Sequence, residues 1–211
     1  MGSAQRTANG AALAVTPRQQ DRRARMLDAA ASLLVDRSYD EIQIRDVAAR
    51  SGVALGTLYR YFPSKEQLFA HVLLQWSASF DERVRAARPG RSDEENLRLA
   101  LRRVARSFER YPHHFQLITV LEVSTDPAVV EPFQTYSRRF VAGLESTVPN
   151  VPEVDRAPLV ELATALIGSL LRGWWLGQIS TRSVHSRLDD AVRLLFAGTQ
   201  PSRAMLVKSV Q

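Results

Sequence analysis

The sequence contains no cysteine among its 211 residues. This absence excludes disulfide bonds, thiolate catalysis and cysteine-based metal sites. The chain also lacks a Gly-rich phosphate loop, an internal repeat and a low-complexity tract, and no Ser/His/Asp or paired-carboxylate group stands out. We therefore expect that the protein is not an enzyme and that it needs no cofactor.

A long hydrophobic run without charge is missing as well. The most apolar stretch lies within residues 155–180, and a membrane-spanning helix needs about 20 predominantly apolar residues. Arg172 would lie inside such a span, with Glu161 at its edge, so we expect a buried helix and no membrane partner. The first 17 residues are small and polar, unlike a signal peptide, and we expect them to be disordered and the protein to be cytoplasmic.

The neighbouring residues His113 and His114 are the one pair that suggests a metal site. Neighbours on a helix point about 100° apart, and the residues four positions further on are apolar. We therefore expect no metal there.

Positive charge is in excess, with a formal net charge of +6. Residues 1–65 carry ten Lys and Arg against six Asp and Glu, whereas residues 66–211 carry eighteen against sixteen. The first third therefore contributes +4 and the rest +2. This balance favours a polyanionic partner, and either a nucleic acid or a membrane surface would select it.

Residues 43–65, QIRDVAARSGVALGTLYRYFPSK, contain two short helical patterns. Ile44, Val47 and Ala48 recur at helical spacing and predict one buried face. Gly52 suits the tight reversal that follows, and Leu58 and Phe62 continue the buried stripe in a second helix. Two short helices joined by a Gly-containing turn are typical of a helix-turn-helix, whose second helix enters the DNA major groove.

The remaining positions of the second helix suit a DNA surface. Gly56 allows close backbone approach, Thr57 and tyrosine hydroxyls can bond phosphates, and Leu55 can contact a thymine methyl. Arg60 can bond a guanine edge or a phosphate, or lie along its own backbone. The alternative interpretations are that Tyr59 and Tyr61 are packing residues and that Lys65 is only a solvated charge. Pro63 ends the helix and Ser64 is the expected N-cap of the next one.

The run GVALGTLYRYFPSKEQLF, preceded by IRDVAARS, resembles the DNA-binding signature of the TetR family of bacterial transcriptional regulators. The resemblance covers about residues 22–74. Gln43 and Ala54 depart from it. The family often has Thr or Ser as the helix cap at the position of Gln43, and Ser at the position of Ala54. The resemblance implies DNA contacts at eight positions. These are Arg45, Leu55, Gly56, Thr57, Tyr59, Arg60, Tyr61 and Lys65.

Helical periodicity continues through the rest of the chain and predicts an all-α protein. We expect helices at about residues 18–35, 64–87, 93–111, 115–123, 127–148, 155–180 and 184–197, besides the two of the motif. The expected domains are a helix-turn-helix unit at 18–65 and an effector-binding and dimerisation unit at 66–198, followed by a flexible tail at 199–211. Ser92 and Glu95 have the spacing of a capping box.

Several apolar side chains of the second unit are candidates for a ligand pocket or for plain core. The ligand candidates are Leu117, Leu121, Phe133, Tyr136, Leu170 and Trp174. The resemblance also implies that the last two long helices form a four-helix dimer interface. Its candidate residues in the last helix are Leu188, Ala191, Val192 and Leu195.

These patterns lead to the hypothesis of a homodimeric repressor that binds a near-palindromic operator in double-stranded DNA and is released by a small hydrophobic effector. DVA-x-x-SGVALGTLYRYFPSK and SRLDDAVRLLFAG are similar to actinobacterial regulators of sterol catabolism of the KstR type. That similarity implies an apolar acid, a sterol derivative or an acyl-CoA. The alternatives are an effector-independent activator or architectural DNA protein, and a helical lipid carrier.

Overall fold

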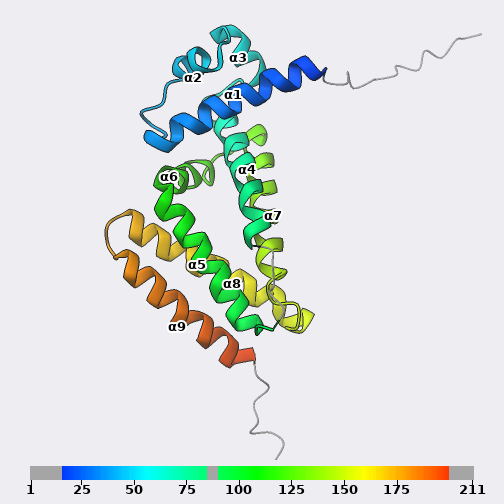
Figure 1. Ribbon diagram of the computed structural model, residues 1–211, viewed down its shortest axis with the longest axis vertical. Coiled ribbons are helices and arrows are strands. Elements are labelled where there is room, and N and C mark those ends of the chain that lie inside the picture. The colour runs from blue at the N-terminus through cyan, green and yellow to red at the C-terminus, as the bar shows by residue number, and fades with distance from the viewer. Residues whose placement is uncertain (1–15, 85–89, 200–211) are drawn as a thin grey trace, which may run out of the picture.

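The computed structural model describes residues 16–84 and 90–199, and within them the chain forms nine α-helices and no strand (Figure 1). In chain order the helices are α1 (Pro17–Asp36), α2 (Ile44–Ser51), α3 (Leu55–Tyr61), α4 (Lys65–Val84), α5 (Asp93–Arg110), α6 (Pro112–Leu121), α7 (Pro127–Glu145), α8 (Glu153–Trp175) and α9 (Thr181–Thr199). The predicted all-α class is confirmed. The arm at 1–15, the residues 85–87 predicted in the fourth helix and the tail from 200 onward lie outside the described residues.

Local sequence signals set most helix ends. The Ser92 hydroxyl accepts from the Glu95 N–H, and the Glu95 carboxylate accepts from the Ser92 N–H, so the predicted capping box is confirmed. An equivalent box of Thr16 and Gln19 begins α1. The sequence predicted a gap between helices at residues 112–114, but Pro112 begins α6, because proline suits the first helical turn. The sixth helix therefore starts three residues earlier than predicted.

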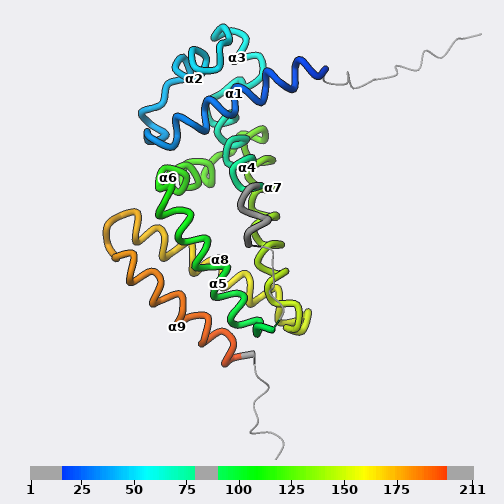
Figure 2. Tube along the Cα trace, viewed as in Figure 1, coloured from blue at the N-terminus to red at the C-terminus, as the bar shows by residue number. Residues whose placement is uncertain are grey.

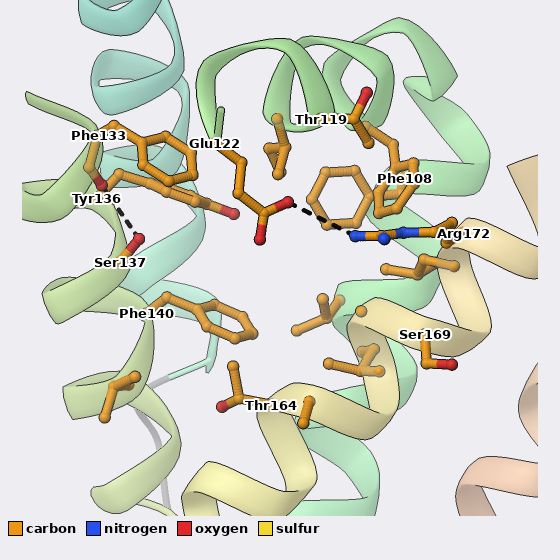
Figure 3. Close-up of a pocket in the computed structure, with 18 residues that line it drawn as sticks. Phe108, Thr119, Glu122, Phe133, Tyr136, Ser137, Phe140, Thr164, Ser169 and Arg172 are labelled. Carbon is orange, nitrogen blue, oxygen red and sulfur yellow. Dashed lines mark hydrogen bonds and ion pairs between the residues drawn. The ribbon is translucent and has the colours of Figure 1, made fainter. Parts of the chain in front are cut away.

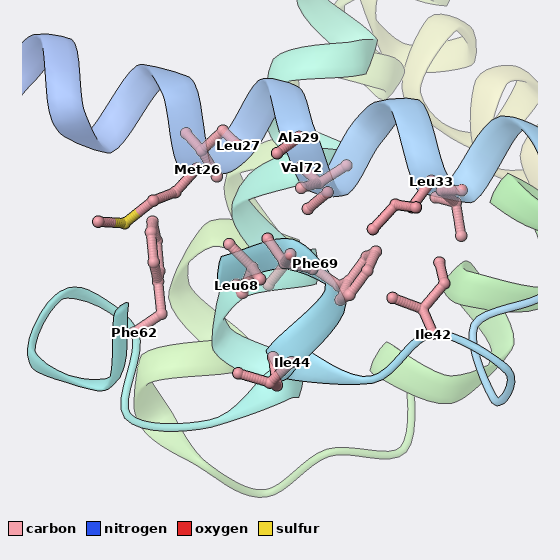
Figure 4. Close-up of a cluster of buried hydrophobic side chains, with 14 of the residues drawn as sticks. Met26, Leu27, Ala29, Leu33, Ile42, Ile44, Phe62, Leu68, Phe69 and Val72 are labelled. Atoms are coloured by element: carbon pink, nitrogen blue, oxygen red, sulfur yellow. The ribbon is translucent and has the colours of Figure 1, made fainter. Parts of the chain in front are cut away.

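One hydrophobic cluster unites α1, α2 and α3 with the first half of α4 (Figure 4). Met26, Leu58 and Phe62 are almost fully buried within it, as are Leu68 and Phe69 of α4. The same cluster takes in side chains from the two following helices, namely Leu117, Leu121 and Val129. Side chains of α4, α6 and α7 therefore complete the hydrophobic core of the helix-turn-helix unit.

A second cluster lies between α5, α7, α8 and α9, at the other end of the elongated molecule (Figure 2). The buried carboxylate of Asp93 accepts from the N–H groups of Asn150 and Val151 at 2.7 and 3.0 Å, which fixes the start of α5 to the α7–α8 connection. Arg102 of α5 forms an ion pair with Asp189 of α9. These contacts hold the helices of the second cluster in register.

Two side chains pack against both clusters, Trp76 of α4 and Ile118 of α6. The α4 helix also runs along α7, the most extensive helix pairing in the described chain (Figure 1). The two ends of the molecule are therefore joined through α4, α6 and α7.

His114 lies in this junction and is 2% exposed. Its ring lies 4.6 Å from that of Trp76, and its Nδ1 atom has no hydrogen-bond partner. Burial, with a smaller contribution from His113, lowers the pKa of His114 to about 4. The His114 ring is therefore neutral in the folded protein at pH 7.

We expect the free energy of unfolding to fall as the pH decreases from about 6.5 to about 4. In this range the unfolded chain takes up a proton on His114 that the folded chain does not. The loss attributable to His114 is up to about 3 kcal/mol. Urea unfolding at a series of pH values should show a weaker dependence in His114→Phe than in the parent. A matched change, His113→Gln, should retain the dependence, and equal slopes in His114→Phe and the parent would contradict this assignment.

Candidate functional site

The turn between α2 and α3 depends on Gly52, which has φ +67°. Its N–H donates to the carbonyls of Ala48 and Ala49, and the Val53 N–H donates to Ala48 at 3.1 Å. Such left-handed helix ends favour glycine because a Cβ atom is strained there. The turn directs α3 outward, with only Leu58 fully buried.

The outer face of α3 presents most of the predicted DNA-contacting side chains. Leu55 is 43% and Tyr59 46% exposed, and Gly56 and Arg60 are exposed beside them. Arg45 is exposed on α2, next to Asp46. The predicted residues with intermediate exposure are Thr57, Tyr61 and Lys65. The eight candidates therefore come from α2, α3 and the start of α4, and their contacts with DNA stay a prediction.

Neither α2 nor α3 has a side-chain N-cap hydrogen bond. This agrees with the expectation from Gln43 and Ala54, which are poor caps. The α3 helix spans only 7 residues, too few to be stable alone. Its position therefore depends on packing through Leu58 and Phe62.

Tyr39 ties the motif to α4 and α6. Its carbonyl accepts from the Lys65 ammonium, which also lies 4.1 Å from the centre of its ring. Its hydroxyl donates to Glu66 at 3.0 Å, and its N–H donates to the Gln116 side chain at 3.2 Å. Gln116 in turn donates to Asp40 at 3.0 Å. Lys65 is therefore a structural tie as well as a candidate phosphate ligand.

A cavity of about 480 Å³ lies between α5, α6, α7 and α8 (Figure 3). Its walls are mainly aromatic and aliphatic, which suits an apolar ligand. Phe133 and Tyr136, two of the predicted ligand residues, line it, and their rings are 5.9 Å apart. The lining residues are Val104, Phe108, Phe115, Ile118, Thr119, Glu122, Phe133, Tyr136, Ser137, Phe140, Val141, Thr164, Ala165, Ile167, Gly168, Ser169, Leu171 and Arg172.

The other four predicted ligand residues do not line this cavity. Leu117 and Leu121 are buried in the first cluster, beneath the helix-turn-helix unit. Leu170 is buried in the second cluster and Trp174 packs against it. Helical periodicity shows that these side chains face inward, but not which side of α6 or α8 faces the cavity.

Sequence reasoning missed the two charged lining residues, Glu122 and Arg172. Glu122 caps the end of α6, and Arg172 lies in the last turn of α8. Figure 3 shows the two side chains reaching toward each other across the cavity, with an N–O distance of 3.5 Å. An arginine within the apolar stretch of α8 was a usable signal, because charged side chains are rarely placed among apolar ones without a partner.

Half of the predicted dimer stripe is buried against other helices of the same chain. Leu188 and Val192 are fully buried in the second cluster, and only Ala191 and Leu195 are partly exposed. Leu188 and Val192 therefore cannot contact a partner without unpacking α9 from this cluster. The exposed leucines of the last two helices are Leu162 and Leu194, and Leu176, just beyond α8, is exposed as well.

The described residues contain no group of three or more metal-ligating side chains. Across the same ranges, no helix is long and apolar enough to cross a membrane.

Comparison with known proteins identifies the family. The profile of bacterial regulatory proteins of the tetR family matches residues 26–72. The transcriptional repressor KstR of Rhodococcus jostii is 32% identical over 181 residues, which cover 84% of each chain. The chain belongs to the TetR family. It is therefore a DNA-binding transcriptional regulator and not an enzyme.

Solved structures of transcriptional regulators share the fold. One from Rhodococcus sp. RHA1 has a TM-score of 0.73 and 28% identity, covering 87% of this chain and 99% of its own. FadR of Bacillus subtilis, solved with stearoyl-CoA, has a TM-score of 0.64 and 18% identity, covering 83% and 98%. The helical arrangement of this TetR-family chain is thus found in related regulators.

A substitution at Gly56 can test folding and DNA binding separately in this TetR-family protein. A Cβ atom there would meet nothing within 4 Å, and the residue lies in a helix. We expect Gly56→Ala to keep or raise the stability, by up to about 1 kcal/mol, and to weaken DNA binding at least about ten-fold by holding the backbone away from DNA.

Urea unfolding and fluorescence anisotropy with bound DNA measure the two effects of Gly56→Ala. Gly198→Ala is the matched control, since Gly198 is also helical, has open space around it and does not line the cavity. Undiminished DNA binding by Gly56→Ala would show that the backbone at Gly56 does not approach DNA.

Proposed function

We propose that the chain is a dimeric repressor that binds a near-palindromic operator and leaves it when an apolar effector fills the cavity. The observation that carries this proposal is that α6 both lines the cavity and contacts the DNA-binding unit. Ile118 lines the cavity and packs on the first cluster, and Gln116 of the same helix bonds Tyr39. A DNA partner makes the cytoplasm the expected location.

The effector that suits the cavity is a small apolar molecule, a sterol derivative or the acyl part of an acyl-CoA. Phe108, Phe133 and Phe140 supply flat apolar walls. The volume of about 480 Å³ accommodates a compact hydrophobic group. The stearoyl-CoA bound by FadR shows that this fold can hold a long acyl ligand.

Release from DNA would require a second arrangement of α6 and α4. An effector can shift the equilibrium only by its different affinity for the two arrangements. A ligand that displaces α6 would strain the Gln116 bonds to Tyr39 and Asp40, and these residues adjoin α2. The change would alter the position of α3 relative to the α3 helix of the partner subunit.

Dimerisation is needed because a single short recognition helix reads little sequence. Two recognition helices about 34–36 Å apart would enter successive major grooves of the operator. Exposed apolar side chains on both of the last two helices support an interface there: Leu162 is 57% exposed on α8, and Leu194 is 61% exposed on α9. These two replace Leu188 and Val192 as the proposed contacts.

We expect Leu162→Arg to convert the dimer into a monomer, because an arginine would be buried without a partner in the interface. DNA affinity should fall at least about ten-fold with the loss of two-site binding. Sedimentation velocity and anisotropy measure these effects. Val35→Arg is the control, since Val35 is 50% exposed on α1, which is not one of the two helices of the proposed interface. A Leu162→Arg protein that remains dimeric would reject this interface.

The proposed function is tested by selection from a genomic DNA library at physiological salt, repeated with a panel of acyl- and steroyl-CoA esters and the free acids. We expect one near-palindrome to be enriched and one ligand class to release it. Enrichment that no ligand reverses would instead favour the effector-independent activator or architectural protein.

A further inference from the structure

We propose that Arg172 binds a carboxylate on the effector, and that Glu122 occupies this position while the cavity is empty. The inference rests on the proposed effector cavity and specifies the chemistry of its ligand. Among the eighteen lining residues, Glu122 and Arg172 are the two that carry charge. Their charges meet inside an otherwise largely aromatic and aliphatic wall (Figure 3).

The existing ion pair is weak enough to be exchanged. It has one contact, at 3.5 Å, and the Arg172 and Glu122 side chains are 59% and 54% exposed. Exposed pairs of this kind contribute little to stability. Within the described chain this is the only ion pair or hydrogen bond of the guanidinium, which carries five N–H donors. Arg172 therefore retains donors for a second carboxylate.

The positions of the two residues favour loss of Glu122 rather than loss of Arg172. Glu122 lies just beyond α6, at a helix end where a negative charge is disfavoured. Arg172 lies within the last turn of α8, where a positive charge is favoured and the backbone is held by the helix. The cation is therefore the fixed member of the pair, and the carboxylate is the exchangeable one.

A ligand carboxylate has an advantage over Glu122. The apolar body of the ligand, held against Phe133 and Phe140, would keep its carboxylate near Arg172 at a high effective concentration. A planar guanidinium can also bind a carboxylate through two parallel hydrogen bonds. This chemistry selects a free apolar acid. It also gives Glu122 a role as an internal competitor that sets the threshold for binding.

The test uses the full-length protein without DNA and titrates decanoate, 1-decanol and decyltrimethylammonium by calorimetry at pH 7.5. The three probes share a chain length and differ in head-group charge. We expect decanoate to bind about ten-fold more tightly than decanol, as a charge-assisted pair predicts. Arg172→Gln should abolish that preference. Glu122→Gln should tighten decanoate binding several-fold and leave decanol binding unchanged.

Two further variants make the test specific. Arg172→Lys should keep part of the preference for decanoate, because it keeps the charge without the planar fork. Arg106→Gln should have no effect, since Arg106 is exposed on α5 and does not line the cavity. The inference is overturned if the ammonium binds more tightly than decanoate, if Arg172→Gln retains the preference for the acid, or if no probe binds. Decanoate that binds through Arg172 without releasing operator DNA would count against the proposed function and leave this inference standing.

Discussion

The packing of α4 against both hydrophobic clusters is the constraint on which the rest of the structure depends. Leu68 and Phe69 close the core beneath the helix-turn-helix, and Trp76, further along the same helix, packs on both clusters. Because buried interiors are close-packed, α4 cannot shift at one end without repacking the other. The short α3 helix lacks a side-chain cap, so its orientation depends on this packing.

Tyr39 adds hydrogen bonds to this packing constraint. It is 5% exposed, and burial together with the Glu66 carboxylate raises the pKa of its phenol, so it stays a neutral donor. Its backbone joins Lys65 at the start of α4 to Gln116 in the middle of α6. This network is partly buried, and its hydrogen bonds favour one arrangement, because a broken bond at the buried Tyr39 would leave a desolvated group without a partner. The cavity wall formed by α6 is thus connected to the DNA-binding unit by hydrogen bonds as well as by packing.

The sequence was sufficient for the helices and for the DNA-binding motif, and less so for the second unit. Local signals such as the Ser92 capping box and Gly52 act within a few residues, so they can be recognised without the fold. The faces of α8 and α9 could not be assigned in this way. A stripe such as Leu188 and Val192 is equally apolar whether it meets α5 or a second subunit, and the choice depends on contacts distant in sequence. The Arg172–Glu122 pair was missed for the same reason, since 50 positions separate its partners.

The shared helices also set a limit on regulation. If an effector lowers the affinity for DNA by some factor, DNA must lower the affinity for the effector by the same factor. Under the proposed mechanism, the contact between Glu122 and Arg172 is weak, so little free energy would be lost when a ligand replaces Glu122. A stronger internal pair would hold α6 to α8 against any ligand, whereas an apolar wall without charge would accept many hydrophobic molecules. The observed arrangement lies between these extremes, so the proposed response to an effector would be both selective and reversible.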